Sequence, residues 1–377
     1  MNSKRIENKG EYVMRKMPHF HGSDLEEIEK YYGIPKESIV GFGANVNPLG
    51  ISETVRAEVT DHLDVIMTYP DRNYTSLKKV IGNYCHVRPE HVVVGNGSTE
   101  LISMLIQHLK PRKALLVGPT YSEYEREIGL CGGEMVYYNL SPENEFQLDL
   151  DAFLDYLDDS IDLLIMCNPN NPTSSAVSAT NIECILKKCV QHNIFVMVDE
   201  TYVEFAPDIE EITCMPYVEH FKNIMVIRGI SKFYAAPGLR LGYGVTSNMA
   251  FIHLLKTHQN PWSLNSIGAY AGEIMLTDDE FIARTRALIA SERERIYKEL
   301  ESIPYLHTFR PVANFFLVKI LKEDVTSFDI FDHLIRKGLM VRDCSSFQNL
   351  NGEYFRFCIM NPEDNTRLLD GLKEYFI

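Results

Sequence analysis

The sequence predicts an α/β fold, with a large domain on a mostly parallel sheet and a smaller α+β domain after it. From about residue 91, short apolar segments alternate with longer amphipathic ones, the pattern of strands joined by helices. The apolar segments are continuous, as expected for parallel strands buried on both faces. After about residue 277 the pattern changes to a long charged helix followed by short strand-like segments.

Six strands are expected in the large domain, at residues 91–95, 113–118, 134–139, 162–168, 194–200 and 223–229. Helical patterns separate them, for example at residues 98–110, 122–132 and 180–193. The later segments read as a helix over 278–302, strands at 313–320, 339–343 and 354–360, a helix over 328–338 and a terminal helix. We therefore assign residues 46–277 to the large domain and residues 1–45 plus 278–377 to the small one. The first 45 residues, which lack a strong period, are expected to pack between the domains or at a subunit contact.

Composition narrows the class of protein. The chain of 377 residues carries 37 basic and 52 acidic side chains, a net charge of −15, so it should not bind nucleic acid or an anionic membrane. It has no apolar run near 18 residues, which argues against a membrane span. The eight cysteines show no C-x-x-C or zinc spacing and the N-terminus has no secretory signal, so we expect reduced thiols, no metal site and a cytoplasmic protein.

The first chemical motif is GNGSTE, residues 95–100, which follows a predicted strand and opens a predicted helix. Small residues at a helix N-terminus let backbone N–H groups approach an anion, and the helix adds partial positive charge. We interpret Gly97, Ser98 and Thr99 as a phosphate cradle. The alternative is an ordinary helix cap made by Ser98 or Thr99.

Two further motifs follow strands at the same predicted edge of the sheet, where open α/β sheets bind ligands. NPNNPT, residues 168–173, places the amide of Asn171 there, although it could be only a strand-exit turn. VMVDETY ends with Asp199 and Tyr202, and a carboxylate at the tip of an apolar strand needs a cationic partner or water. Asp199 could hold a protonated ring nitrogen, or it could simply cap the next segment.

The fourth motif, residues 228–244, reads RGISKFYAAPGLRLGYG and contains Ser231, Lys232 and Arg240. A lysine among small and apolar residues is costly to desolvate as an ammonium, which makes Lys232 a candidate imine former. The alternative is a surface lysine. The four motifs together match the needs of pyridoxal phosphate, which has an aldehyde, a pyridine nitrogen, a phosphate and a ring hydroxyl. Tyr121, in GPTYSEY, is then placed to stack on the ring.

With these motifs in order, the sequence resembles the fold-type I pyridoxal-phosphate enzymes of the class I/II aminotransferase family, over nearly the whole chain. It is most similar to the branch that holds histidinol-phosphate aminotransferases and L-threonine-O-3-phosphate decarboxylases. ANVNPLG at 44–50, KFYAAPGLRLGY at 232–243 and PWSLN at 261–265 lean toward the decarboxylases. The early His21-Gly22 also resembles their His-Gly start, although Ser23 stands where they have a second glycine.

The resemblance implies a role for each matching residue. Lys232 would form the imine and move protons, and Asp199 would pair with the pyridine nitrogen. Asn171 and Tyr202 would contact the ring oxygen. The cofactor phosphate would be held by Ser98, Thr99, Ser231 and Arg240, and by Tyr69 of a neighbouring subunit in a homodimer. Arg356 would bind the substrate carboxylate, and a distal substrate phosphate would be bound by Arg342, His21 and Asn45.

Two departures from the family pattern stand out: Ser174 replaces the usual glycine after NPNNPT, and the segment around Arg356 reads FRFCIMNPEDN. Without the family, Arg342 and Arg356 would be read as surface arginines paired with acids. Three functions follow as hypotheses: a threonine-phosphate decarboxylase-like lyase acting on a small phosphorylated L-amino acid, an aminotransferase of the histidinol-phosphate type, and a regulator that only keeps the cofactor fold. The chemistry depends on which Cα bond of the substrate is held perpendicular to the cofactor ring.

Overall fold

The computed structural model describes residues 20–377, and its largest element is a seven-stranded sheet. The strand order is β2-β8-β7-β6-β5-β3-β4, with β8 antiparallel to both of its neighbours and the other pairs parallel. The strands are β2 (Val92–Asn96), β3 (Lys113–Gly118), β4 (Glu134–Asn139), β5 (Leu163–Cys167), β6 (Phe195–Asp199), β7 (Ile224–Gly229) and β8 (Leu241–Val245). The six predicted strands and the mostly parallel sheet are confirmed; β8 is a seventh strand inside the fourth motif.

Helices cover both faces of this sheet, because alternate residues of its strands pack on opposite sides. Leu115, Leu164 and Val196 belong to one apolar core, whereas Leu116, Ile165 and Met197 belong to the other. Helices α4, α5 and α8 pack into the second core, and α3, α7 and α9 into the first. The helices of this part are α2 (Glu53–Asp61), α3 (Thr75–Cys85), α4 (Ser98–Leu109), α5 (Ser122–Leu130), α6 (Leu150–Tyr156), α7 (Ala179–Gln191), α8 (Met249–His258) and α9 (Ser266–Met275).

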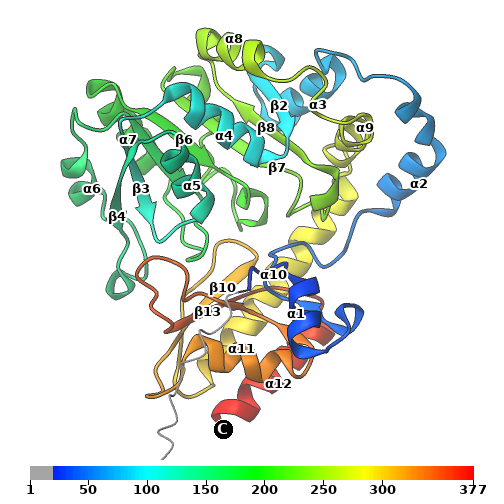
Figure 1. Ribbon diagram of the computed structural model, residues 1–377, viewed down its shortest axis with the longest axis vertical. Coiled ribbons are helices and arrows are strands. Elements are labelled where there is room, and N and C mark those ends of the chain that lie inside the picture. The colour runs from blue at the N-terminus through cyan, green and yellow to red at the C-terminus, as the bar shows by residue number, and fades with distance from the viewer. Residues whose placement is uncertain (1–19) are drawn as a thin grey trace, which may run out of the picture.

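A second, antiparallel sheet of order β12-β13-β10-β9 forms the smaller part of the molecule. Its strands are β9 (Leu306–Thr308), β10 (Phe315–Ile320), β12 (Arg342–Asp343) and β13 (Tyr354–Cys358). The long helix α10 (Asp279–Glu301) runs from the large sheet toward it, and α11 (Ser327–Ile335) and α12 (Pro362–Phe376) flank it (Figure 1). Short 3-10 helices lie at Lys36–Ser38, Leu63–Met67, Pro89–His91, Pro142–Asn144, Val203–Phe205, Met215–Glu219 and Pro237–Leu239.

The segment before residue 46 packs mainly on the small sheet's side of the molecule. Strand β1 (Val40–Gly41) pairs in parallel with β11 (Leu339–Met340), and Phe20 stacks on Phe331 of α11. Helix α1 (Leu25–Tyr32) follows the same side, where Tyr32 donates a 2.9 Å hydrogen bond to Asp332. The strand expected at 339–343 is therefore two strands, β11 and β12, in different sheets. The domain boundaries at 45/46 and 277/278 stay a prediction, and residues 1–19 of that assignment lie outside the described residues.

The register of the parallel strands brings the motifs to one edge. Cys167 of β5 is paired with Asp199 of β6, and Asp199 with Ile227 of β7. The strands thus end at the same level, and the segments that follow them leave the sheet side by side. No helix within residues 20–377 is long and apolar enough to cross a membrane.

Candidate active site

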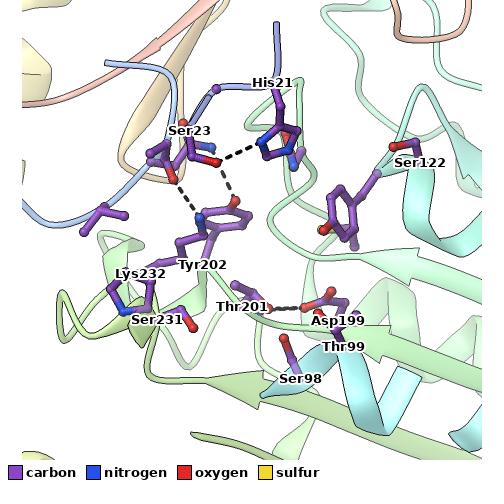
Figure 2. Close-up of a pocket in the computed structure, with 18 of the residues that line it drawn as sticks. His21, Ser23, Ser98, Thr99, Ser122, Asp199, Thr201, Tyr202, Ser231 and Lys232 are labelled. Atoms are coloured by element: carbon purple, nitrogen blue, oxygen red, sulfur yellow. Dashed lines mark hydrogen bonds between the residues drawn. The ribbon is translucent and has the colours of Figure 1, made fainter. Parts of the chain in front are cut away.

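A cavity of about 260 Å³ opens at this edge, between the large sheet and the small one. Thirteen of the predicted site residues line it: His21, Asn45, Ser98, Thr99, Tyr121, Asn171, Asp199, Tyr202, Ser231, Lys232, Arg240, Arg342 and Arg356. Figure 2 shows Ser98, Thr99 and Asp199 at one end of the cavity and His21 with Ser23 at the other. Four motifs far apart in sequence therefore meet in one place, as the strand-end argument predicted.

The first motif forms an open cradle rather than a capped helix end. Gly97 is the N-cap of α4 with a φ of 83°, and no side chain caps the helix. The hydroxyls of Ser98 and Thr99 receive no hydrogen bond from residues 20–377, so the alternative of a serine or threonine cap is wrong. A Cβ on Gly97 would lie 2.4 Å from Nη2 of Arg240, which means that the guanidinium occupies the space a side chain would take. This arrangement of backbone amides, free hydroxyls and one arginine suits a phosphate group.

Close backbone contact shapes the floor of the cradle. A Cβ on Gly242 of β8 would lie 2.2 Å from the backbone nitrogen of Ser98. Glycine therefore lets β8 approach the first turn of α4, and places Arg240, at the end of the 3-10 turn before β8, beside the cradle.

Asp199 is a buried carboxylate with no cationic partner among residues 20–377. It is only 4% exposed and accepts hydrogen bonds from Tyr124 Oη at 2.7 Å, Thr201 Oγ1 at 2.5 Å and Thr201 N at 2.9 Å. Burial raises the pKa of Asp199, while Thr201 and Tyr124 oppose the shift by stabilising the charged form. The Thr201 bonds form a local turn, and the other side of the carboxylate faces the cavity. A protonated ring nitrogen would supply the missing positive charge.

Lys232 lies between the two ends of the cavity and is partly buried (Figure 2). Its Nζ donates a 2.6 Å hydrogen bond to the carbonyl of Ala44. Burial, followed by repulsion from Arg356, lowers the pKa of Lys232 to about 8. A fraction of this amine is therefore uncharged and nucleophilic near neutral pH, unlike the surface lysine of the alternative interpretation.

Tyrosine and asparagine side chains line the wall between Asp199 and the small sheet. The hydroxyl of Tyr202 accepts a 3.3 Å hydrogen bond from Asn45, and the ring packs edge-on against Phe315. Asn171 Oδ1 accepts a hydrogen bond from Nη1 of Arg356. Burial raises the pKa of Tyr202, so its phenol is protonated and able to donate to an oxygen in the cavity.

Tyr121 and Tyr124 stand at the opposite wall. Tyr121 is the N-cap residue of α5, and its ring meets that of Tyr124 edge to face, with centroids 5.6 Å apart. Burial raises the pKa of Tyr121 to about 12. Its place in the cavity agrees with the predicted stacking role, which no contact in the structure tests.

Arg342 and Arg356 are direct cross-strand neighbours on β12 and β13. Arg356 is 5% exposed and donates to Gly43 O at 2.8 Å, and its buried Nε has no hydrogen-bond partner in the described part of the chain. Arg342 donates to Ser346 Oγ at 2.9 Å and to the carbonyl of Phe20. Neither arginine forms an ion pair with an acid within residues 20–377, so the surface ion-pair alternative is wrong. Like charges directly opposite repel each other, and anions in the cavity would remove that repulsion.

Tyr69 lies outside the cavity. It is 78% exposed, and its ring lies tilted by 34° against that of Trp262, with ring centroids 4.7 Å apart. Its predicted contact is with the cofactor phosphate of a neighbouring subunit, and that contact stays a prediction.

Several lining residues were missed by the sequence analysis: Ser23, Tyr124, Cys167, Thr201 and Phe347. Tyr124 could have been found, because it lies one helical turn after Tyr121 and so shares its face of α5. Thr201 could also have been found, because a threonine two residues after an aspartate can bond back to it. Nothing in the sequence signals that Phe347 covers both arginines, at 5.7 Å from Arg342 Cζ and 6.0 Å from Arg356 Cζ.

Comparison with known proteins decides the family. Residues 37–372 match the family model described as aminotransferase class I and II. The chain belongs to this family. The predicted resemblance and fold are thus confirmed, and the protein is an enzyme that depends on pyridoxal 5'-phosphate.

Proteins with two different named activities are among those similar to this chain. The chain is 34% identical over 353 residues to threonine-phosphate decarboxylase of Salmonella typhimurium, covering 94% of this chain and 95% of that one. It is 30% identical over 356 residues to histidinol-phosphate aminotransferase of Methanosphaera stadtmanae, covering 94% and 95%. Its fold is similar to that of histidinol-phosphate aminotransferase from Clostridium acetobutylicum, with a TM-score of 0.83, 30% identity and coverage of 89% and 98%.

The residues that line the cavity fit the chemical groups of pyridoxal phosphate. The free hydroxyls of Ser98 and Thr99 together with Arg240 match the phosphate, and the buried carboxylate of Asp199 matches a protonated pyridine nitrogen. The lowered pKa of Lys232 matches covalent attachment through its amine. Bound at these residues, pyridoxal phosphate supplies an electron sink for a bond to the substrate Cα.

Proposed function

We propose that this enzyme decarboxylates a small L-amino acid that carries a phosphate group, of the O-phospho-L-threonine type, and releases CO2 and an amino-alcohol phosphate. The observation that carries the proposal is that the cross-strand neighbours Arg342 and Arg356 lie beside His21 with no acidic partner within residues 20–377. Opposite residues in an antiparallel pair have Cα atoms only about 5 Å apart. Two acidic groups separated by a few bonds, such as a carboxylate and a phosphate, suit this spacing.

In this reaction, different residues of the cavity bind the substrate and transfer the proton. Arg356 binds the carboxylate, and Arg342 with His21 and Asn45 binds the distal phosphate. Holding both ends would fix the rotation of the substrate about its Cα, and would thereby select the bond to the carboxylate as the one that is broken when the cofactor is bound. Lys232 then delivers a proton to Cα after CO2 has left.

Support for this reaction also comes from the sequence and from similarity. The segments at 44–50, 232–243 and 261–265 lean toward the decarboxylases. The Salmonella decarboxylase is 34% identical, against 30% for the Methanosphaera aminotransferase. Histidinol phosphate has a single acidic group and an imidazole, which would leave one arginine of the pair without an anion.

The alternative function is amino transfer of the histidinol-phosphate type. The 30% identity and TM-score of 0.83 with the Clostridium aminotransferase favour it. The same arginine pair could bind the two carboxylates of an amino donor such as glutamate. The regulator hypothesis is rejected, because the chain belongs to a family of enzymes.

One experiment separates the two reactions. The purified holoenzyme is given O-phospho-L-threonine and CO2 release is measured; in parallel it is given histidinol phosphate with 2-oxoglutarate and glutamate is measured. We expect CO2 release from the first mixture and little glutamate from the second. Glutamate formation without CO2 release would reject the decarboxylase.

Arg342→Met tests the binding of the distal phosphate. Loss of a hydrogen bond between charged groups is worth about 1.5–3 kcal/mol, so KM for O-phospho-L-threonine should rise roughly 10- to 150-fold. Arg336→Met is the matched control, because Arg336 is exposed, lies outside the cavity and forms an ion pair with Asp332 one turn away on α11. An equal KM for both variants would argue against the phosphate site.

A further inference from the structure

His21 stands at the end of the cavity opposite the cradle, and one of its ring nitrogens is already engaged. Nδ1 lies 2.9 Å from the hydroxyl oxygen of Ser23 (Figure 2). Nε2 has no hydrogen-bond partner within residues 20–377. A neutral imidazole carries one proton, and the nitrogen that holds it decides whether the ring donates to an anion or only accepts.

The turn that carries these two side chains is closed by its own hydrogen bonds. The N–H of His21 donates to Asp24 Oδ2 at 2.6 Å, and the N–H of Asp24 donates to His21 O at 3.1 Å. The N–H of Leu25, the first residue of α1, donates to Ser23 O at 3.0 Å. These bonds fix the backbone of the turn, and with it the relative positions of the Cβ atoms of His21 and Ser23.

The turn is also anchored to the cavity wall. A Cβ on Gly22 would lie 2.1 Å from the carbonyl oxygen of Gly43, so the two backbones are in direct contact. That same carbonyl accepts from Arg356 Nη2 at 2.8 Å, and the next one, of Ala44, accepts from Lys232 Nζ at 2.6 Å. The backbone that carries His21 is thus in direct contact with the segment that binds Arg356 and Lys232.

Partial burial and the neighbouring cations favour the neutral form of His21 in the absence of substrate. Burial lowers the pKa of His21, and Arg342, Arg356 and Lys232 add to the shift from three other segments. Asp24, in the same turn, opposes it. The ring therefore enters the binding step with one proton, on Nδ1 or on Nε2.

We propose that Ser23 is a positioning residue whose hydroxyl donates to Nδ1 of His21, so that the proton of the neutral ring stays on Nε2 and is donated to the distal acidic group of the substrate. This inference rests on the proposed function for the identity of that group, a phosphate monoester. The resemblance to the decarboxylases implies a glycine at this place in those enzymes, where this chain has Ser23. Ser23 acts through His21 and does not touch the reacting atoms.

The position of the proton is measured directly by nitrogen NMR of the holoenzyme labelled with 15N-histidine, above the pKa of His21. His21→Gln identifies the His21 signals. We expect a proton-bearing signal for Nε2 and an unprotonated signal for Nδ1 in the wild type. In Ser23→Ala the two signals should move toward each other as both tautomers become populated, whereas Ser38→Ala, an exposed serine bonded to Pro35, should leave them unchanged.

Kinetics give a second, independent readout. Ser23→Ala should raise KM for O-phospho-L-threonine about tenfold, corresponding to roughly 1.4 kcal/mol, with kcat within twofold. The kcat/KM for unphosphorylated L-threonine should not change, and Ser23→Thr, which keeps the hydroxyl, should restore the wild-type KM. A loss shared equally by both substrates would indicate a structural role only and would overturn the proposal.

Different measurements test the role of Ser23 and the decarboxylase activity. A proton on Nδ1 in the wild type, or the same tautomer in wild type and Ser23→Ala, would overturn the role of Ser23 whatever the reaction is. Absence of CO2 release by the wild type would reject the decarboxylase, and the tautomer measurement would still decide whether Ser23 orients His21.

Discussion

Tyr124 gives the sharpest test of how this enzyme maintains the charge of Asp199. Its hydroxyl donates one of three hydrogen bonds to that buried carboxylate, at 2.7 Å, and the other two come from Thr201. Tyr124→Phe removes this donor and keeps the ring that packs against Tyr121. The substitution therefore changes the electrostatics of Asp199 with little change in packing.

The magnitude follows from the loss of one hydrogen bond to a charged group, about 1.5–3 kcal/mol. At 1.36 kcal/mol per unit, the pKa of Asp199 should rise by about 1–2 units above its already raised value. The carboxylate is the active form, so activity is lost as pH falls through this pKa. The acid limb of the kcat profile should therefore move upward by about 1–2 units, so the variant should lose most activity, relative to wild type, on the acidic side of the profile.

The assay is the pH dependence of kcat for wild type and variant, with visible absorbance to confirm that the cofactor is bound. Tyr138→Phe is the control. Tyr138 lies on β4 outside the cavity, and the substitution removes a hydroxyl that donates a 3.4 Å hydrogen bond to Asp149 O. A variant with kcat within twofold of wild type and an unmoved acid limb would refute the claim that Tyr124 maintains the charge of Asp199.

Three further outcomes are expected. Lys232 has a pKa lowered to about 8, so cofactor attachment to the cofactor-free protein, followed by absorbance, should accelerate as pH rises through about 8; a midpoint near 10 would contradict the burial argument. Gly97→Ala forces a Cβ to 2.4 Å from Arg240 in a left-handed conformation and should weaken cofactor binding about tenfold or more by equilibrium dialysis, whereas unchanged affinity would mean that the cradle adapts. In the wild type, the buried side chains of Arg228 and Glu200 form an ion pair at 2.7 Å. Arg228→Met leaves Glu200 without this cation and should lower the free energy of unfolding, measured by urea denaturation, by about 3–5 kcal/mol. An unchanged urea midpoint would contradict a stabilising role for this ion pair.

The secondary-structure elements that could be predicted from the sequence are those marked by a pattern within a short segment of the chain. Buried parallel strands show continuous apolar runs, and the motifs at their ends had to meet because parallel strands end at one edge of the sheet. Strand β8 was not predicted, since its residues LGYGV contain two glycines and follow the 3-10 turn of the fourth motif. Those glycines allow the close approach to α4 and the packing against Met225, which are contacts between distant segments.

Contacts between side chains that are distant in the sequence could not be predicted from local sequence patterns. The sequence placed Arg342 and Arg356 in strands, but their direct opposition depends on the register of β12 with β13. The same holds for Tyr124, whose hydroxyl reaches Asp199 only because α5 lies over the end of β6. Residue identity indicated the chemistry, and tertiary register determined the pairing.

Ser174 shows how a departure from the family pattern can be accommodated. It stands where glycine is usual and adopts a left-handed φ of 60°, which costs a non-glycine residue about 1–2 kcal/mol. Its hydroxyl accepts a 2.9 Å hydrogen bond from Ala313 N, and its carbonyl accepts one from Val312 N at 2.9 Å. A glycine could form only the second bond. The hydrogen bond from Ala313 N to the serine hydroxyl contributes about 1 kcal/mol, which offsets part of the cost of the left-handed conformation. The turn that presents Asn171 to the cavity is thereby fastened to the small sheet that carries Arg356.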